Sequence, residues 1–180
     1  MVHHWFDLQI DLKLATNEVG AEQNVFGVQV KGEPYENVGS QIPSLFLQPD
    51  MSLKVCMEVD GVTLCENLLD TVTADEWFTL WFEQWCWFDG DGEDWCTFYV
   101  IKQTGDDWTI QFYWWNENPI TFYDVEGVIG NTYGTQDFAV AQGQYKNFRL
   151  DQYESRSEPS ATLNALIDTA NLNSDGAANN

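Results

Sequence analysis

Four carboxylates and two glycines fall within one six-residue stretch of the chain. The carboxylates belong to Asp89, Asp91, Glu93 and Asp94. Carboxylate oxygens are the hard ligands that Ca²⁺ prefers, and glycines let a loop bend around an ion. The stretch does not complete an EF-hand, because Val100 stands where that loop needs a glutamate. It is therefore either a calcium site or a solvated acidic turn.

A second group of residues could bind a ligand by stacking. Eight of the nine tryptophans lie between residues 77 and 115, so the aromatic surface is concentrated in one part of the chain. Aromatic rings stack against sugar rings or line a pocket for a flat apolar ligand. The candidate binding residues are Trp81, Trp85, Tyr99, Phe112 and Trp114. The alternative is that these side chains form the core of the protein.

The four cysteines form two local pairs. Cys56 and Cys65 flank an Asp-Gly hairpin turn, and counting outward from it places them opposite each other. Counting outward from the acidic turn places Cys86 opposite Cys96 in the same way. Opposed strand residues bring their Cβ atoms to about the 4 Å that a disulfide needs. Neither pair has zinc-site spacing, so we expect two disulfides and an extracellular or secretory compartment.

These residues must be positioned by β-strands. Residues 77–115 divide into strands at 77–88, 95–103 and 108–115, joined by Gly/Asp turns. With Gln103 paired to Trp108, one face carries Trp81, Trp85, Tyr99, Ile101, Ile110, Phe112 and Trp114. The other face carries Leu80, Phe82, Gln84, Cys86, Phe98, Val100, Tyr113 and Trp115. Both faces are apolar, so neither is an ordinary solvated face, and one of them meets a ligand or partner unless both are covered.

Strand patterns continue on both sides of this region. Further strands are expected at 5–14, 25–30, 44–48, 51–59, 62–67, 120–125, 138–141 and 145–153, with a glycine-rich loop over 127–136. So many short strands with local hairpins indicate an all-β, antiparallel two-sheet sandwich spanning residues 1–153. Residues 154–180 are expected to form an extension that is partly helical, over 160–170, and then disordered.

The charge of the chain limits its partners. It carries 29 acidic and 7 basic residues, a net charge of −22. This excess argues against nucleic acids and anionic membrane surfaces, which are themselves polyanions. It favours solubility, cations or a cationic partner. No apolar run is long enough for a transmembrane helix, and the first residues lack the apolar core of a signal peptide.

The order of these features resembles the concanavalin A-like, laminin-G-like jelly roll. The segments that carry the resemblance are PSLFLQPDMSLKVCMEVDG, EWFTLWFEQ, FYVIKQTGDDW and QGQYKNFRLDQ. The last contains a Gly-x-x-x-Asn/Asp-hydrophobic pattern, here within residues 143–150, that closes the fold in that family. The resemblance implies that Leu80 and Phe82 face inward, which leaves Trp81 and Trp85 on the outer face.

The resemblance also implies functions. Lectin and laminin-G-like relatives bind glycans or proteins outside cells, often with calcium. Glucanase relatives carry Glu-x-Asp-x-x-Glu on one strand, whereas the strand of Glu83 has no second carboxylate. A retaining glycosidase needs two carboxyls about 5 Å apart, so we expect a protein without catalytic activity.

Three functions fit the sequence. The first is an extracellular module that recognises a glycan or protein, with or without calcium. The second is a carrier of an apolar small molecule such as a carotenoid, because two apolar faces accompany a very acidic exterior. The third is a structural subunit that forms homo-oligomers through its second aromatic face.

Overall fold

The computed structural model describes residues 5–30, 41–59, 62–88, 94–116, 125–129 and 139–153, together with Ala165. Ala165 is helical, and the rest of the predicted extension lies outside the described residues. The strands are β1 (Trp5–Leu14), β2 (Gln23–Val30), β3 (Gln41–Leu47), β4 (Ser52–Val59), β5 (Val62–Thr71), β6 (Phe78–Phe88), β7 (Asp94–Thr104), β8 (Asp107–Asn116), β9 (Val125–Ile129), β10 (Ala139–Val140) and β11 (Gly143–Tyr153).

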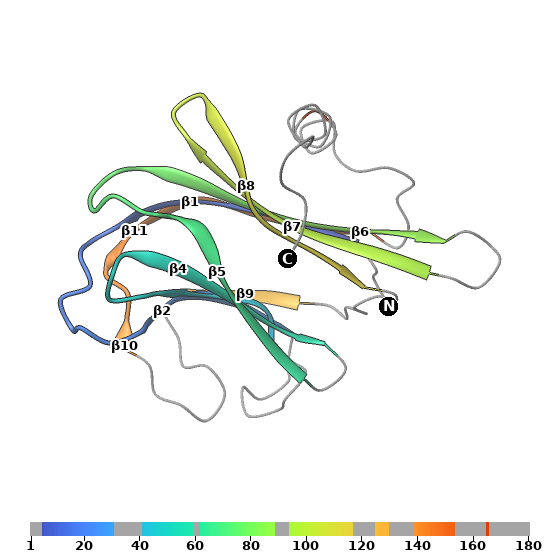
Figure 1. Cartoon of the computed structure of the whole chain (residues 1–180), viewed down its shortest axis with the longest axis horizontal. Helices are drawn as coiled ribbons and strands as arrows, with labels where there is room; N and C mark the ends of the chain where they lie inside the picture. Colours follow the sequence, from blue (N-terminus) through green and yellow to red (C-terminus); the bar gives the residue numbers. More distant parts are fainter. Residues whose placement is uncertain are drawn as a thin grey trace.

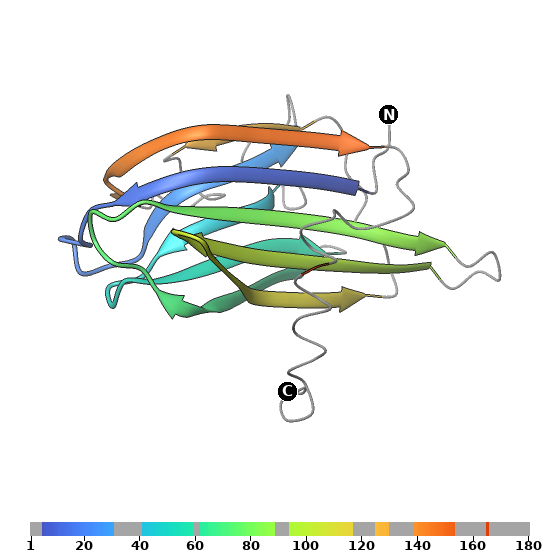
Figure 2. The same ribbon diagram turned by 90° about the horizontal axis from the view of Figure 1, so that it is seen from above.

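The strands form two sheets that lie as two layers (Figure 1). The five-stranded sheet has the order β11-β1-β6-β7-β8, and its strands lie side by side in Figure 2. The six-stranded sheet has the order β10-β2-β3-β4-β5, with β9 also paired to β2. Every pairing is antiparallel except that of β10 with β2. The predicted all-β antiparallel sandwich is confirmed.

The core lies between the sheets and is built from alternate residues of each strand. On β1 the inward residues include Leu8, Ile10 and Leu12, all fully buried. On β6 they include Leu80 and Phe82. Successive side chains of a strand point to opposite faces, so the intervening residues of β1 and β6 lie on the outer surface of the five-stranded sheet. The inward orientation of Leu80 and Phe82 is thus confirmed.

Most predicted strands are found where the sequence placed them, although β2, β3 and β11 each begin two or three residues earlier than predicted, and two further differences are larger. The loop predicted from Gly127 was wrong over residues 127–129, because β9 extends to Ile129 and pairs Gly127 with Val28. The strand predicted to end at residue 67 continues to Thr71, since β5 pairs Thr71 with Ser52 of β4. Both differences come from tertiary pairing that local propensity does not encode. Residues 120–124 and 130–138 lie outside the described residues.

The register predicted for the central hairpin is confirmed, but the next one contains a bulge. Cys86 pairs with Cys96, Trp87 with Trp95 and Gln103 with Trp108, as expected. Beyond Ile101, which pairs with Ile110, the next pair is Val100 with Phe112. Gln111 is therefore an extra residue on β8, and every later residue of that strand is shifted by one.

Gln111 anchors this bulge to the opposite sheet. Its side chain is buried, its Oε1 accepts from the Asp70 backbone N–H at 3.0 Å, and its Nε2 donates to Asp70 Oδ2 at 2.9 Å. Asp70 lies on β5, so these bonds join the edge strands of the two sheets. A polar side chain is tolerated in this buried position because its hydrogen bonds are satisfied.

Gly143 allows the last strand to close against the first. It begins β11 and pairs with Leu14 at the end of β1. A Cβ atom on Gly143 would lie 2.6 Å from the backbone oxygen of Lys13 and 3.2 Å from the Leu14 Cα. The neighbouring Ala15 N–H donates to the Gln142 carbonyl at 2.8 Å. The two strands therefore approach too closely here for any residue with a side chain.

Candidate ligand-binding face

The outer surface of the five-stranded sheet is a grid of aromatic and polar residues. Three rows cross the sheet from β11 to β8. They are Asp151–Asp7–Glu83–Tyr99–Tyr113, then Arg149–Gln9–Trp81–Ile101–Ile110, then Lys146–Asp11–Thr79–Gln103–Trp108. We call these fifteen positions the outer face. The pairing of β1 with both β6 and β11 brings these residues together from distant parts of the chain.

Two pairs of aromatic rings lie on the outer face. The rings of Tyr99 and Tyr113 are stacked, with centroids 6.1 Å apart and planes 25° from parallel. Trp81 and Trp108 meet edge to face at 5.9 Å. Tyr113 is 58% exposed, while Trp81, Tyr99 and Trp108 are half-buried. The rings of each pair therefore hold each other in place and still expose surface that a ligand can contact.

A polar cluster adjoins these rings at the β1–β6–β11 side. Asp11 accepts two hydrogen bonds of 2.6 Å, from Thr79 Oγ1 and from Asn147 Nδ2. Asn147 has a φ of 52° and lies where the β1–β11 register shifts. The Lys146 Nζ lies 4.0 Å from the centroid of the Trp77 ring, a cation–π contact. Thr79, Asn147 and Lys146 thus hold Asp11 and Trp77 in place.

Two carboxylates lie beneath this surface. Asp7 and Glu83 are directly opposed on β1 and β6, and they are only 7% and 1% exposed. Both take part in interactions with other groups. Burial raises the pKa of the Tyr99 hydroxyl, and Tyr113 and Glu83 raise it further against an opposing hydrogen bond from Thr97. Tyr99 therefore keeps its proton at neutral pH and can both donate and accept hydrogen bonds.

The outer face contains some of the predicted binding residues. Trp81 and Tyr99 lie on it as expected. Trp85 pairs in backbone register with Thr97, and its side chain lies outside the described part of the structure.

The register predicted for Phe112 and Trp114 was wrong. The bulge at Gln111 pairs Phe112 with Val100 and Trp114 with Phe98, whose side chains are in the core. The side chains of Phe112 and Trp114 are themselves outside the described part of the structure. Tyr113 was assigned to the other face, and the same shift brings it opposite Tyr99. The one available signal was Gln111, the polar residue in the otherwise apolar stretch from Ile110 to Trp115.

The acidic turn is only partly described. Asp89, Asp91 and Glu93 lie outside the described residues, and of Asp94 only the backbone is described, at the start of β7. In the part of the chain that the structure covers, no three His, Cys, Asp or Glu residues are grouped so that they could hold a metal ion. Within the same residues, no helix has the length and apolar character needed to cross a membrane.

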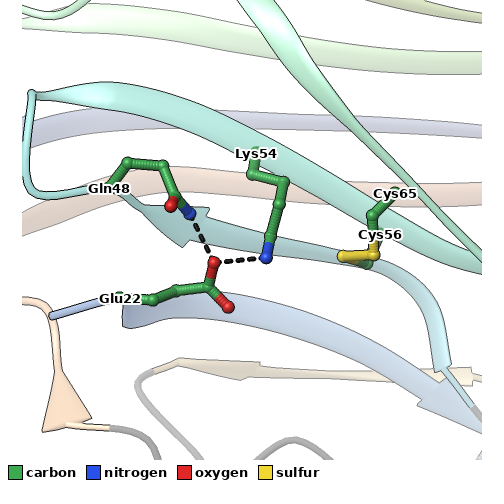
Figure 3. Close-up of a disulfide and its surroundings, with 5 residues drawn as sticks. All are labelled: Glu22, Gln48, Lys54, Cys56 and Cys65. Carbon is green, nitrogen blue, oxygen red and sulfur yellow. Dashed lines mark hydrogen bonds and ion pairs between the residues drawn. A yellow bond between two sulfur atoms is a disulfide. The ribbon is translucent and has the colours of Figure 1, made fainter.

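The disulfide predicted between Cys56 and Cys65 is confirmed (Figure 3). It joins β4 to β5 at a Cα separation of 4.1 Å, the close spacing typical of opposed residues that are not hydrogen-bonded to each other. Val55 and Met57 belong to the core, so Cys56 lies on the outer surface of the six-stranded sheet. Cys96 is also disulfide-bonded and pairs in register with Cys86, whose side chain is outside the described part.

A polar group lies beside this disulfide, formed by Glu22 just before β2, Gln48 just after β3, and Lys54 on β4 (Figure 3). Glu22 Oε2 accepts from Gln48 Nε2 at 2.6 Å and forms an ion pair with Lys54. The Lys54 Nζ also lies 5.2 Å from the centroid of the Phe46 ring. All three side chains are partly exposed, so the ion pair contributes little to stability. We assign the disulfide and its surroundings a structural role, on the sheet opposite the outer face.

The two sheets, their order and the closing strand define a jelly-roll sandwich that resembles the concanavalin A-like proteins in fold. No protein-family model and no curated protein matches the chain. Several solved structures share the fold, and the likeness is one of fold because sequence identity is low throughout.

Two of these structures show the same carbohydrate-binding module with different ligands. The CBM40 of the Ruminococcus gnavus IT-sialidase bound to α2,3-sialyllactose is 13% identical, with a TM-score of 0.55 over 93% of this chain and 83% of that one. The module bound to α2,6-sialyllactose is 12% identical, with a TM-score of 0.55 over 91% and 83%. The endo-β-1,4-glucuronan lyase of Trichoderma reesei is 11% identical, with a TM-score of 0.51 over 83% and 68%. The fold thus occurs both in a glycan-binding module and in a glycan-cleaving enzyme.

Proposed function

We propose that this protein is an extracellular, non-catalytic glycan-binding protein whose binding site is the outer face. The observation that carries the proposal is the pair of ring contacts, Tyr99–Tyr113 and Trp81–Trp108, fixed side by side on one sheet surface. Aromatic rings bind the apolar faces of sugars, while hydroxyl and amide groups beside them bind sugar hydroxyls. The outer face supplies such groups in Thr79, Gln103 and the Tyr99 hydroxyl. The glycan-binding module with the same fold gives independent support.

The carboxylates of the outer face do not favour catalysis. Asp7 and Glu83 are opposed across two strands, a spacing near the roughly 5 Å of a retaining glycosidase. Both are almost completely buried, however, so a sugar cannot bring its glycosidic bond to them. We therefore propose that the carboxyl groups of Asp7 and Glu83 support the aromatic rings from below and take no part in catalysis. Incubation of bound glycans with the protein should release no new reducing ends, and their release would make the protein an enzyme.

A Tyr113→Ala substitution should lower the affinity for a bound glycan about tenfold, since stacking by one aromatic ring contributes roughly 1–1.5 kcal/mol. The glycan should be the strongest ligand found on a glycan array, and affinity should be measured by titration calorimetry. Tyr113 is mostly exposed, so its loss should not unfold the sandwich. The matched control is Leu69→Ala, an exposed apolar residue on the other sheet. Unchanged affinity in Tyr113→Ala would remove the stacked pair from the site.

We also propose that calcium binds the acidic turn formed by Asp89, Asp91, Glu93 and Asp94. The support is the chemistry of the donors, four carboxylates with glycines between them. Calcium should raise the melting temperature of the protein, because an ion that binds only the folded state stabilises it by mass action. Asp89→Asn with Asp91→Asn should abolish the rise. If the double variant responds to calcium as the unaltered protein does, the ion binds elsewhere.

A further inference from the structure

We propose that the outer face selects glycans that carry no carboxylate or sulfate groups. This inference rests on the proposed function and specifies the ligand class of the same site. It follows from the charges of the face and of the chain, and from the contacts that the cations of the face already make.

The outer face carries more carboxyl groups than cationic groups. Its three rows contain four carboxylates, those of Asp7, Asp11, Glu83 and Asp151, but two cations, those of Lys146 and Arg149. The whole chain has a net charge of −22, so the surrounding field has the same sign. Such a field lowers the local concentration of anions and opposes their binding.

The two cations are already engaged by the protein. Arg149 Nε is paired with Asp151 Oδ2 on the same strand, and Lys146 Nζ lies over the Trp77 ring. A guanidinium or ammonium group that donates to a sugar carboxylate gives the strongest recognition of it. An acidic sugar that approached Arg149 would lie beside the carboxylate of Asp151, and one that approached Lys146 would compete with the Trp77 ring.

The test is a glycan array on which each backbone is present in neutral, amine-bearing and acidic forms. Three β-1,4-linked probes are then compared by calorimetry, namely cellohexaose, the hexamer of glucosamine and the hexamer of glucuronic acid. We expect the neutral and amine-bearing forms to bind at least about tenfold more tightly than the acidic form of the same backbone. The difference should shrink at high salt, because exposed charges are screened. Tighter binding of an acidic form than of its neutral counterpart would overturn the inference and leave glycan binding intact.

A charge variant tests the cause of the selectivity. Asp151→Asn releases Arg149 and removes one negative charge, so it should raise the affinity for the acidic form relative to the neutral form several-fold. Glu66→Gln makes the same change in net charge on an exposed residue of β5 in the other sheet and should leave the ratio unchanged. Equal shifts in both variants would attribute the selectivity to net charge instead of to the outer face. An array without any bound glycan would instead contradict the proposed function itself.

Discussion

Replacing Phe82 with alanine is expected to lower the free energy of unfolding by about 3–5 kcal/mol. Phe82 is fully buried at the centre of the core. Its ring meets Phe26 of the opposite sheet edge-on, at a centroid distance of 5.5 Å, and lies 6.3 Å from Phe98 of the neighbouring strand. The substitution removes apolar burial and leaves a cavity between the sheets, which rigid strands cannot close.

Urea denaturation followed by tryptophan fluorescence measures this loss. The control is Leu69→Ala, because Leu69 is 79% exposed and its removal should change stability by less than about 0.5 kcal/mol. Phe82→Leu should recover part of the lost stability, since it restores apolar volume. A loss below about 1 kcal/mol in Phe82→Ala would mean that the two sheets do not pack through this ring.

Removal of the disulfide between Cys56 and Cys65, by changing both residues to alanine, is expected to cost about 2–3 kcal/mol. The two cysteines have a sequence separation of 9, so the bridge closes a short loop. The loop-closure entropy that the bridge removes from the unfolded chain predicts a stabilisation of about 2–3 kcal/mol for a loop of this length. The expected cause is the greater freedom of the unfolded chain, since β4 and β5 remain paired on either side of the bridge.

Thermal and urea unfolding of the double variant provide the measurement. The single variants are poor comparisons because each leaves a free thiol, so the double variant is compared with the unaltered protein under non-reducing conditions. Glycan affinity serves as the internal control and should not change, because the disulfide lies on the sheet opposite the outer face. An affinity that fell with the disulfide would place part of the binding site on the six-stranded sheet.

The sequence predicted much of this fold for physical reasons that can be named. The alternation of β1 and the Gly/Asp turns on either side of β7 gave strands and registers correctly, because the side-chain period and hairpin geometry are local properties. The disulfide followed from the same counting. The order of strands in the sheets depends on long-range pairing, and no local pattern in the sequence predicts it.

The site was harder to predict than the fold. Trp81 and Tyr99 were found because they lie on strands whose register is set by an adjacent turn. Tyr113 was missed because one inserted residue, Gln111, reverses the faces of everything that follows it. The contribution of β1, including Asp7 and Asp11, could not be seen because β1 pairs with β6 over a long sequence separation, as between Phe6 and Gln84.

The central place of β1 in its sheet also determines the order in which the chain can fold. β6, β7 and β8 are neighbours in sequence and can form hairpins as soon as they exist, whereas β1 pairs with β6 on one side and with β11 on the other. The β1–β11 ladder joins Trp5 to Tyr153, so its formation closes a loop of almost the whole described chain. Closing such a loop is slow because the chain loses conformational entropy before the contacts between the two strands form. During synthesis β1 therefore waits with an unpaired, hydrogen-bonding edge until residues 143–153 have been made, and this waiting period is when the protein is most exposed to aggregation.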